Sequence, residues 1–293
     1  MMQATGSAAG AMQSGIAYGK KQATPAEMGA LQRIRFLFSA LAMGLAQDVR
    51  KSSVLRKMPP ADAKYAKEIA ELKRDGMTVI PDYLPPERCD ELRERVLGFV
   101  AQFSRTTELP TGTKVVYRDQ DAKYSVDTGM VDVFNIDLSV PGLEPIKSDP
   151  MMTEMVSGAC GKPVKVKFLT SYVNRGIKQT RGYHIDTIST TEFKAFLYLS
   201  DVPDESYGPY TYAKGTHGFS LRKYANIARN IITGGYSVSD MGWVPLKRVM
   251  KFIALKGTLA IADQNGFHRG WPQADGRVRV VVVIDFDAVH HQP

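Results

Sequence analysis

Apolar and polar residues follow two different periods along the chain. Before about residue 105, apolar positions recur at three- and four-residue intervals, which predicts helices with one apolar face. From about residue 111 the apolar residues form short runs between turn-rich or polar stretches, which predicts strands. The pattern therefore predicts a mainly β protein with flanking α-helices, in which a sandwich or barrel core has helices packed outside it.

The helical part is expected to begin after a segment without structure. Residues 1–27 are rich in Gly, Ala, Ser and Gln and are predicted to be disordered. Residues 28–58 are predicted to form a basic amphipathic helix, and residues 59–293 a single domain. The apolar face of the predicted helix contains Leu31, Ile34, Phe38, Leu41, Leu45 and Val49.

The basic helix has two interpretations. Its uncharged core, residues 36–46, has 11 residues, about half of the roughly 20 that span a bilayer. Arginines and lysines flank this core, so the helix either lies on an anionic membrane surface or packs on the domain. The first alternative predicts peripheral contact at the inner face of a membrane, and both place the chain in the cytoplasm.

The remaining elements follow from local signals. Residues 61–76 predict a second helix that ends with Gly76 in the C-cap role, and residues 85–103 a third that begins with prolines. The predicted strands are MTVIPDYL, TKVVYR, GMVDVFNID, VKVKFLTSYVN, EFKAFLYLSDV, GTLAIAD and VRVVVVIDFD. A helical insertion is expected from about residue 221.

Composition narrows the class of protein. The chain has 293 residues, 44% hydrophobic and 23% charged, the balance of a globular protein. Two cysteines without a short spacing argue against a disulfide scaffold and fit a reducing cytosol. The net charge of +8 favours an anionic partner or belongs to an ordinary basic protein. No nucleic-acid-binding motif is present, so nucleic acid is not expected as a partner.

One short motif suggests chemistry. His184 and Asp186 form an HxD, and in an extended strand residues i and i+2 point to the same face. This signal alone is weak. It gains weight from His268, which follows an apolar strand and a polar turn. Two imidazoles and a carboxylate on one face of a metal are typical of iron(II) oxygenases.

An arginine extends this hypothesis to a cosubstrate. Arg279 lies 11 residues after His268, at the start of a β-branched run. A guanidinium that points from a buried strand needs an anion, and a dicarboxylic cosubstrate supplies one. Arg277, two residues earlier, remains an alternative anchor.

The HxD, the distant histidine and the arginine resemble the pattern of the phytanoyl-CoA hydroxylase-like branch of the Fe(II)/2-oxoglutarate oxygenases. Three further stretches are similar to that family: LKRDGMTVIPDYLPPERCDELRERV (72–96), GPYTYAKGTH (208–217) and GTLAIADQNGFH (257–268). Together the motifs span roughly residues 65–287, and their order and spacing make the set specific.

The resemblance implies a double-stranded β-helix, the cupin-like jelly roll, with Fe(II) held by His184, Asp186 and His268. It further implies that Arg279 binds the distal carboxylate of 2-oxoglutarate, that O2 is the second cosubstrate, and that succinate and CO2 are released. The retained Asp186 favours hydroxylation or desaturation over halogenation. The expected substrate is a small or lipid-like metabolite.

The chain departs from the family after its distal ligand. Residues 269–272 read Arg-Gly-Trp-Pro where the family has G-S-x-x-N, so a hydroxyl that contacts 2-oxoglutarate is missing. Tyr172 and Asn174, on the strand before the HxD, are the candidates to replace it.

Other polar residues have alternative interpretations. His217 either caps its own turn or lines the mouth of the site. The cations Arg175, Lys178 and Arg181 form a solvated face or receive an anionic substrate. Two other functions compete: a non-catalytic jelly roll that binds a ligand or membrane through the basic helix, and a zinc hydrolase at the same three ligands.

Overall fold

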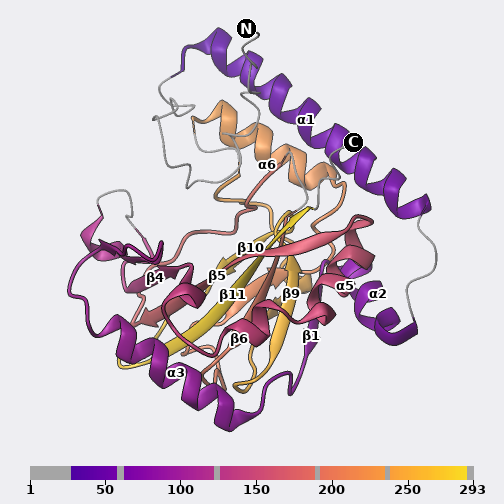
Figure 1. The fold of residues 1–293 in the computed structure, drawn as a ribbon. Helices are drawn as coiled ribbons and strands as arrows, with labels where there is room; N and C mark the ends of the chain where they lie inside the picture. The colour runs from indigo at the N-terminus through magenta and orange to yellow at the C-terminus, as the bar shows by residue number, and fades with distance from the viewer. Residues whose placement is uncertain (1–27, 58–62, 122–125, 189–191, 235–237, 289–293) are drawn as a thin grey trace, which may run out of the picture.

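A computed structural model describes residues 28–57, 63–121, 126–188, 192–234 and 238–288 (Figure 1). The segment predicted to be disordered, residues 1–27, lies outside the described residues.

Two antiparallel sheets form the centre of the molecule. The larger has eight strands, in the order β1 (Met77–Ile80), β9 (Leu259–Asp263), β6 (Phe193–Tyr198), β11 (Val278–Ala288), β5 (Val164–Arg175), β4 (Met130–Phe134), β3 (Lys114–Tyr117) and β2 (Thr107–Glu108). The smaller has three, in the order β10 (His268–Gly270), β7 (Tyr210–Ala213) and β8 (Val249–Lys251).

Helices surround these sheets (Figure 1). The α-helices are α1 (Ala30–Lys57), α2 (Ala66–Asp75), α3 (Pro86–Val100), α4 (Glu144–Lys147), α5 (Pro150–Cys160) and α6 (Leu221–Ile232). Short 3-10 turns cover Ala63–Tyr65, Arg118–Gln120, Ile136–Leu138 and Leu246–Arg248.

The long strand β11 shows how the large sheet separates two cores. Alternate side chains of a strand point to opposite faces. Val280, Val282 and Ile284 pack in one core with residues of α2, α3 and α5, whereas Val281 and Val283 pack in a second core with aromatic residues of both sheets. The odd-numbered positions of β11 therefore face the space between the sheets.

Local signals predicted several element boundaries. Gly76 ends α2 with φ 78°, the left-handed conformation that glycine adopts without strain, and its N–H donates to Leu72 O at 3.0 Å. Helix α5 was not predicted, although it carries recognisable end signals. The Asp149 side chain accepts from Met151 N–H at 2.9 Å, Pro150 occupies the first turn, and Gly161 follows the last residue.

The basic helix α1 packs along α6 at the outside of the molecule, at the end opposite to α3 (Figure 1). Its inward face makes both apolar and polar contacts, and Ala40 packs in a cluster with Ile227 and Ile231 of α6. The buried Asp48 carboxylate accepts from Lys223 Nζ at 2.8 Å and from Tyr224 Oη at 2.6 Å, and Gly44 leaves room for the Tyr224 ring. No helix of the described residues is long and apolar enough to cross a membrane.

Most of the predicted apolar face of α1 is exposed. Five of its side chains point to solvent, and Leu41 is half-buried. The exposed residues are Leu31, Ile34, Phe38, Leu45 and Val49. The helix therefore packs on the domain through the opposite face from the one that its periodicity marks as apolar.

Candidate metal centre

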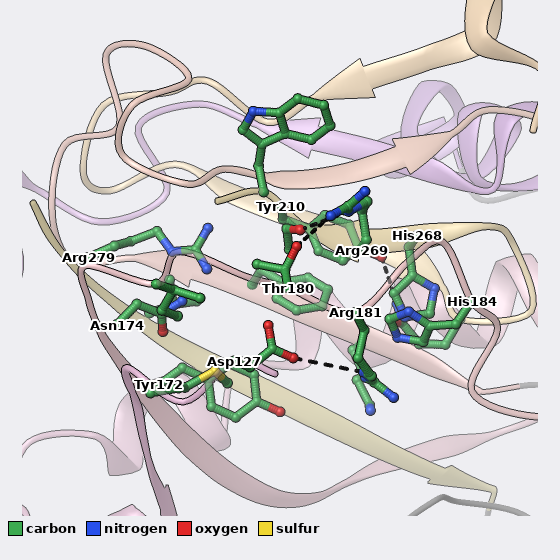
Figure 2. A pocket seen from close by; sticks show the side chains of 18 of the residues that line it. Asp127, Tyr172, Asn174, Thr180, Arg181, His184, Tyr210, His268, Arg269 and Arg279 are labelled. Carbon is green, nitrogen blue, oxygen red and sulfur yellow. Dashed lines mark hydrogen bonds and ion pairs between the residues drawn. The ribbon is translucent and has the colours of Figure 1, made fainter. Parts of the chain in front are cut away.

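Three side chains from two distant segments of the chain converge between the two sheets, and Figure 2 shows two of them, His184 and His268, side by side. His184 and Asp186 follow β5, and His268 opens β10; their ligand atoms all lie within 4.8 Å of one another. Asp186 Oδ1 is 3.7 Å from His184 Nε2 and 3.4 Å from His268 Nε2. Among the described residues, this is the one cluster of His, Cys, Asp and Glu side chains with metal-binding spacing.

The backbone fixes the spacing of the two histidines. His184 lies in an isolated β-bridge rather than in a regular strand, and it exchanges two backbone hydrogen bonds of 3.0 Å with His268. The imidazole centroids consequently lie 4.3 Å apart. Asp186 N–H donates to Gln264 O at 3.0 Å, so the loop that leads to His268 also holds the backbone of the third group.

Hydrogen bonds set the orientation of both imidazoles. His184 Nδ1 lies 2.9 Å from Gly182 O, and His268 Nδ1 lies 2.9 Å from Gly266 O. Since a carbonyl only accepts, each Nδ1 carries a proton, and Nε2 is the ring nitrogen that faces the site. Burial, with the neighbouring His268, lowers the pKa of His184 well below its usual range, so its imidazole is neutral.

Lys194 of β6 divides the roles of the two Asp186 oxygens. Its ammonium donates to Asp186 Oδ2 at 2.8 Å, which leaves Oδ1 on the side of the histidines. Burial alone would raise the pKa of Asp186, but the charge of Lys194 outweighs burial and holds this pKa well below its usual range. The group is therefore a carboxylate with one oxygen available to a cation.

Lys194 itself lies among three acidic groups. In addition to Asp186, Glu192 Oε1 is 3.4 Å and Asp285 Oδ1 is 3.8 Å from its Nζ. Burial lowers the pKa of this lysine, but these carboxylates outweigh burial and raise it well above its usual range. The ammonium thus stays charged beside the three candidate ligands.

Arg279 lies across the same pocket from the histidines (Figure 2). Like the other odd-numbered residues of β11, it faces the space between the sheets. It pairs with Asn174 of β5, and Val281 pairs with Tyr172. Arg279 Nη1 donates to Gly208 O, but the buried Nε has no hydrogen-bond partner among the described residues. Asn174 Oδ1, also buried, lacks one as well. These orphaned polar atoms indicate a missing polar ligand.

Three further cations line the pocket. Arg118 pairs with Asp132 at 2.8 Å and with Asp127 at 3.5 Å, so its charge is largely compensated. Arg181, which is about half exposed, lies 4.0 Å from Asp127. Arg269 donates to Thr180 Oγ1 at 2.6 Å.

Arg269 lies in the segment 269–272, where the chain departs from the family pattern. Its guanidinium lies 5.6 Å from the ring centroid of Tyr183 and 5.3 Å from that of Trp271. This stacking holds the side chain at the pocket wall. The two aromatic residues therefore support a pocket cation, and Trp271 lines the pocket itself.

Comparison with solved structures identifies the fold. The structure is similar to the non-heme α-ketoglutarate-dependent epimerase SnoN from nogalamycin biosynthesis, with TM-score 0.53, 15% identity, and coverage of 77% of this chain and 83% of SnoN. AviO1 from Streptomyces viridochromogenes Tue57 gives 0.53 at 16% identity, covering 80% of this chain and 99% of AviO1. HygX from Streptomyces hygroscopicus, with nickel and 2-oxoglutarate bound, gives 0.54 at 12% identity, covering 77% and 88%.

The fold is a jelly roll. The prediction of a mainly β protein with flanking helices and this core is confirmed. No protein-family model and no curated protein sequence matches the chain. The assignment to the phytanoyl-CoA hydroxylase-like branch stays a prediction.

His217 and Arg277, which each had two possible roles in the sequence, lie outside the pocket lining. His217 is buried, and its Nε2 lies 3.2 Å from Lys73 O in the last turn of α2. It is outside the pocket lining, and this contact joins it to a helix rather than to its own turn. Arg277 precedes β11, is exposed, and donates to Tyr207 Oη at 2.9 Å.

Lys194 was not predicted from the sequence. The only local signal is a charged residue within the apolar run FKAFLY, where it shares a strand face with Phe196 and Tyr198. All three line the pocket. A single cation on the inward face of a buried strand is expensive unless it is paired, and this could have marked it as part of a site.

Proposed function

We propose that the chain is an Fe(II)- and 2-oxoglutarate-dependent oxygenase of the phytanoyl-CoA hydroxylase-like type that oxidises a small molecule, with O2 as the second cosubstrate. Hydroxylation is the proposed reaction rather than halogenation, because the chain has a carboxylate, Asp186, at the position of the third metal ligand. The observation that carries the proposal is the convergence of His184 Nε2, His268 Nε2 and Asp186 Oδ1 beside a pocket that ends at Arg279.

The donor set fits Fe(II). Two imidazole nitrogens and one carboxylate oxygen would hold the metal, and a set of only three protein ligands would allow further ligands to bind it. When bound, the metal and 2-oxoglutarate supply the oxidising chemistry. The protein's contribution is to hold the ligand atoms, through the two Nδ1 hydrogen bonds and the Lys194 contact to Asp186.

The far end of the pocket fits a carboxylate. Arg279 has an unpartnered Nε among the described residues, and a buried guanidinium is stabilised by a bidentate anion. Asn174 and Tyr172 line the same end. A primary amide offers both a donor and an acceptor, so rotation of the Asn174 side chain lets its nitrogen donate to a carboxylate oxygen. We assign the distal carboxylate of 2-oxoglutarate to these residues.

The proposed substrate is a small molecule with an anionic group. SnoN and HygX have been crystallised with nogalamycin RO and hygromycin B, respectively. In this chain, Arg181 and Arg269 line the pocket in addition to Arg279, and Arg181 is about half exposed. An anionic group would neutralise these cations at the pocket mouth.

An anaerobic titration tests the cosubstrate and metal together. Protein loaded with Fe(II) is expected to develop a visible charge-transfer absorption band when 2-oxoglutarate is added, and to release succinate once oxygen is admitted with substrate. His184→Ala removes a ligand and should abolish both signals. His217→Ala provides the matched control, because it also replaces a buried histidine but lies outside the pocket.

The same titration separates the competing functions. A zinc hydrolase has no use for 2-oxoglutarate, and a non-catalytic jelly roll would release no succinate. If 2-oxoglutarate neither binds the Fe(II) protein nor is consumed by it in the presence of candidate substrates, the proposal is wrong.

A further inference from the structure

The outer helical layer, defined as α1 together with residues 218–234 and 238–248, exposes most of the large apolar side chains that reach solvent in the described part of the chain. Ten of the fourteen large apolar side chains exposed in the described part of the chain belong to it. They are Leu31, Ile34, Phe38, Leu45, Val49, Phe219, Leu221, Ile232, Trp243 and Leu246. Exposed apolar residues that cluster in one region indicate a surface that binds a partner, whereas single exposed apolar residues are common on any protein.

The side chains of α1 form a continuous stripe within this layer. Leu31, Phe38 and Leu45 follow each other at seven-residue intervals, with exposures of 63%, 69% and 47%. Ile34 lies between Leu31 and Phe38, and Val49 extends the stripe toward the C-terminal end of the helix. The opposite face of α1 is already occupied, because Ala40, Gly44 and Asp48 pack on α6.

Charge in the layer has one sign. Residues 28–57, 218–234 and 238–248 contain eleven basic and two acidic residues, a net charge of +9, whereas the whole chain carries +8. One of the two acids, Asp48, is buried against Lys223. On the exposed face of α1, Arg35 and Arg50 flank the apolar stripe. The positive charge of the protein is thus concentrated beside its exposed apolar side chains.

We propose that the outer helical layer is a docking surface for anionic phospholipid membranes, with α1 lying in the plane of the interface. Apolar side chains would enter the acyl boundary, and the arginines would contact lipid phosphates. The combination of an apolar stripe with neighbouring arginines favours an anionic membrane over other partners. A nucleic acid would leave the apolar stripe exposed, and an antiparallel or parallel second copy would bring Arg35 and Arg50 against arginines with no exposed acid on α1 to pair them.

Vesicle flotation of the full chain tests the proposal. Binding is expected to vesicles that contain about 30% phosphatidylserine, and at least tenfold weaker binding to neutral phosphatidylcholine vesicles. Raising the salt concentration from about 0.1 M to about 0.5 M should weaken binding several-fold, because it screens the arginine contacts.

Paired variants locate the surface. Phe38→Ser/Leu45→Ser should weaken binding at least tenfold, whereas Leu138→Ser/Leu255→Ser, two exposed leucines outside the layer, should leave it unchanged. Arg35→Glu/Arg50→Glu should abolish binding to anionic vesicles, whereas Lys165→Glu/Lys167→Glu on the exposed side of β5 should reduce it far less. Equal thermal melting of all four variants would exclude misfolding as the cause.

Three results would overturn the proposal. The first is that the protein does not bind anionic vesicles at low salt. The second is that the layer variants and the control variants lose binding equally. The third is that the protein is a dimer in solution and that Phe38→Ser/Leu45→Ser dissociates it. The last result would assign the face to a second copy of the chain. None of them depends on the oxygenase activity, so they are independent of the proposed function.

Discussion

Lys194 and Asp186 form the contact that orients the candidate metal centre. The lysine on β6 binds Asp186 Oδ2 at 2.8 Å and so turns Oδ1 toward both histidines. The same ammonium lies near Asp285, which pairs with it across the β11–β6 ladder, and near Glu192. One buried cation thus compensates three carboxylates, one of which is a candidate ligand.

Replacing this lysine should destabilise the metal-free protein. Lys194→Met leaves three acidic groups without their common cation, and removing one partner of a buried ion pair costs about 3 kcal/mol or more. We expect a lower melting temperature, measured by scanning calorimetry without metal. Added Fe(II) should raise the melting temperature of the variant more than that of the unmodified chain, because the metal replaces part of the lost positive charge.

Lys194→Arg is the control for charge. It keeps a cation in the cluster and should recover most of the lost stability, even though its geometry toward Asp186 changes. If Lys194→Met melts at the same temperature as the unmodified protein, the cluster is not a source of stability and this account of Asp186 is wrong.

Arg279 and Arg277 provide a matched pair for the cosubstrate end of the pocket. Arg279→Leu removes a buried guanidinium that faces the pocket, and it should weaken 2-oxoglutarate binding roughly 100-fold by removing a desolvated charge partner. Arg277→Leu removes an exposed guanidinium two residues earlier and should have little effect. The dissociation constant for 2-oxoglutarate, measured anaerobically with Fe(II), distinguishes the two. Equal effects would contradict the assignment.

The sequence predicted the candidate ligands because their pattern combines local and spaced signals. Three signals can be recognised in the sequence itself: the HxD, the turn before His268 and the alternation along β11. Lys194 could not be derived in this way. Its contacts with Asp186 and Asp285 depend on β6 lying next to β11 in the sheet, which is a pairing between distant parts of the chain.

Helix α1 shows a second limit of periodicity. The repeat of apolar residues correctly indicated an amphipathic helix, but it did not reveal which face is buried. The buried face contains Ala40, which packs in an apolar cluster with α6 residues, Gly44, which leaves room for the Tyr224 ring, and the ion pair of Asp48 with Lys223. Such contacts depend on complementary groups on α6, and a hydrophobic pattern does not record them.

An ion pair joins α1 to the loop that leads to His268. Lys51 pairs with the fully buried Asp263, which ends β9 and begins the turn toward His268. Lys51→Met is expected to lower the free energy of unfolding by about 3 kcal/mol, since it leaves a buried carboxylate unpaired. Chemical denaturation measures this loss. Arg50→Met, at the exposed neighbouring position, should change stability by less than about 0.5 kcal/mol, and a loss of equal size there would contradict the role of the pair.

The buried His217 should make stability sensitive to pH. Burial lowers its pKa below the usual 6.5, so the folded protein keeps it neutral while the unfolded chain takes up a proton as the pH falls. Its contribution to stability is therefore present above pH 6.5 and is lost as the pH falls below that value.

His217→Gln tests this contribution directly. Glutamine can still donate to Lys73 O but does not titrate, so the free energy of unfolding of the variant should decline less between about pH 7.5 and pH 5.5. Part of the decline should remain, because the pKa of His184 is lowered in the same direction. Denaturation of the metal-free proteins across this range provides the measurement. Identical slopes for the variant and the unmodified chain would show that His217 does not titrate differently on folding.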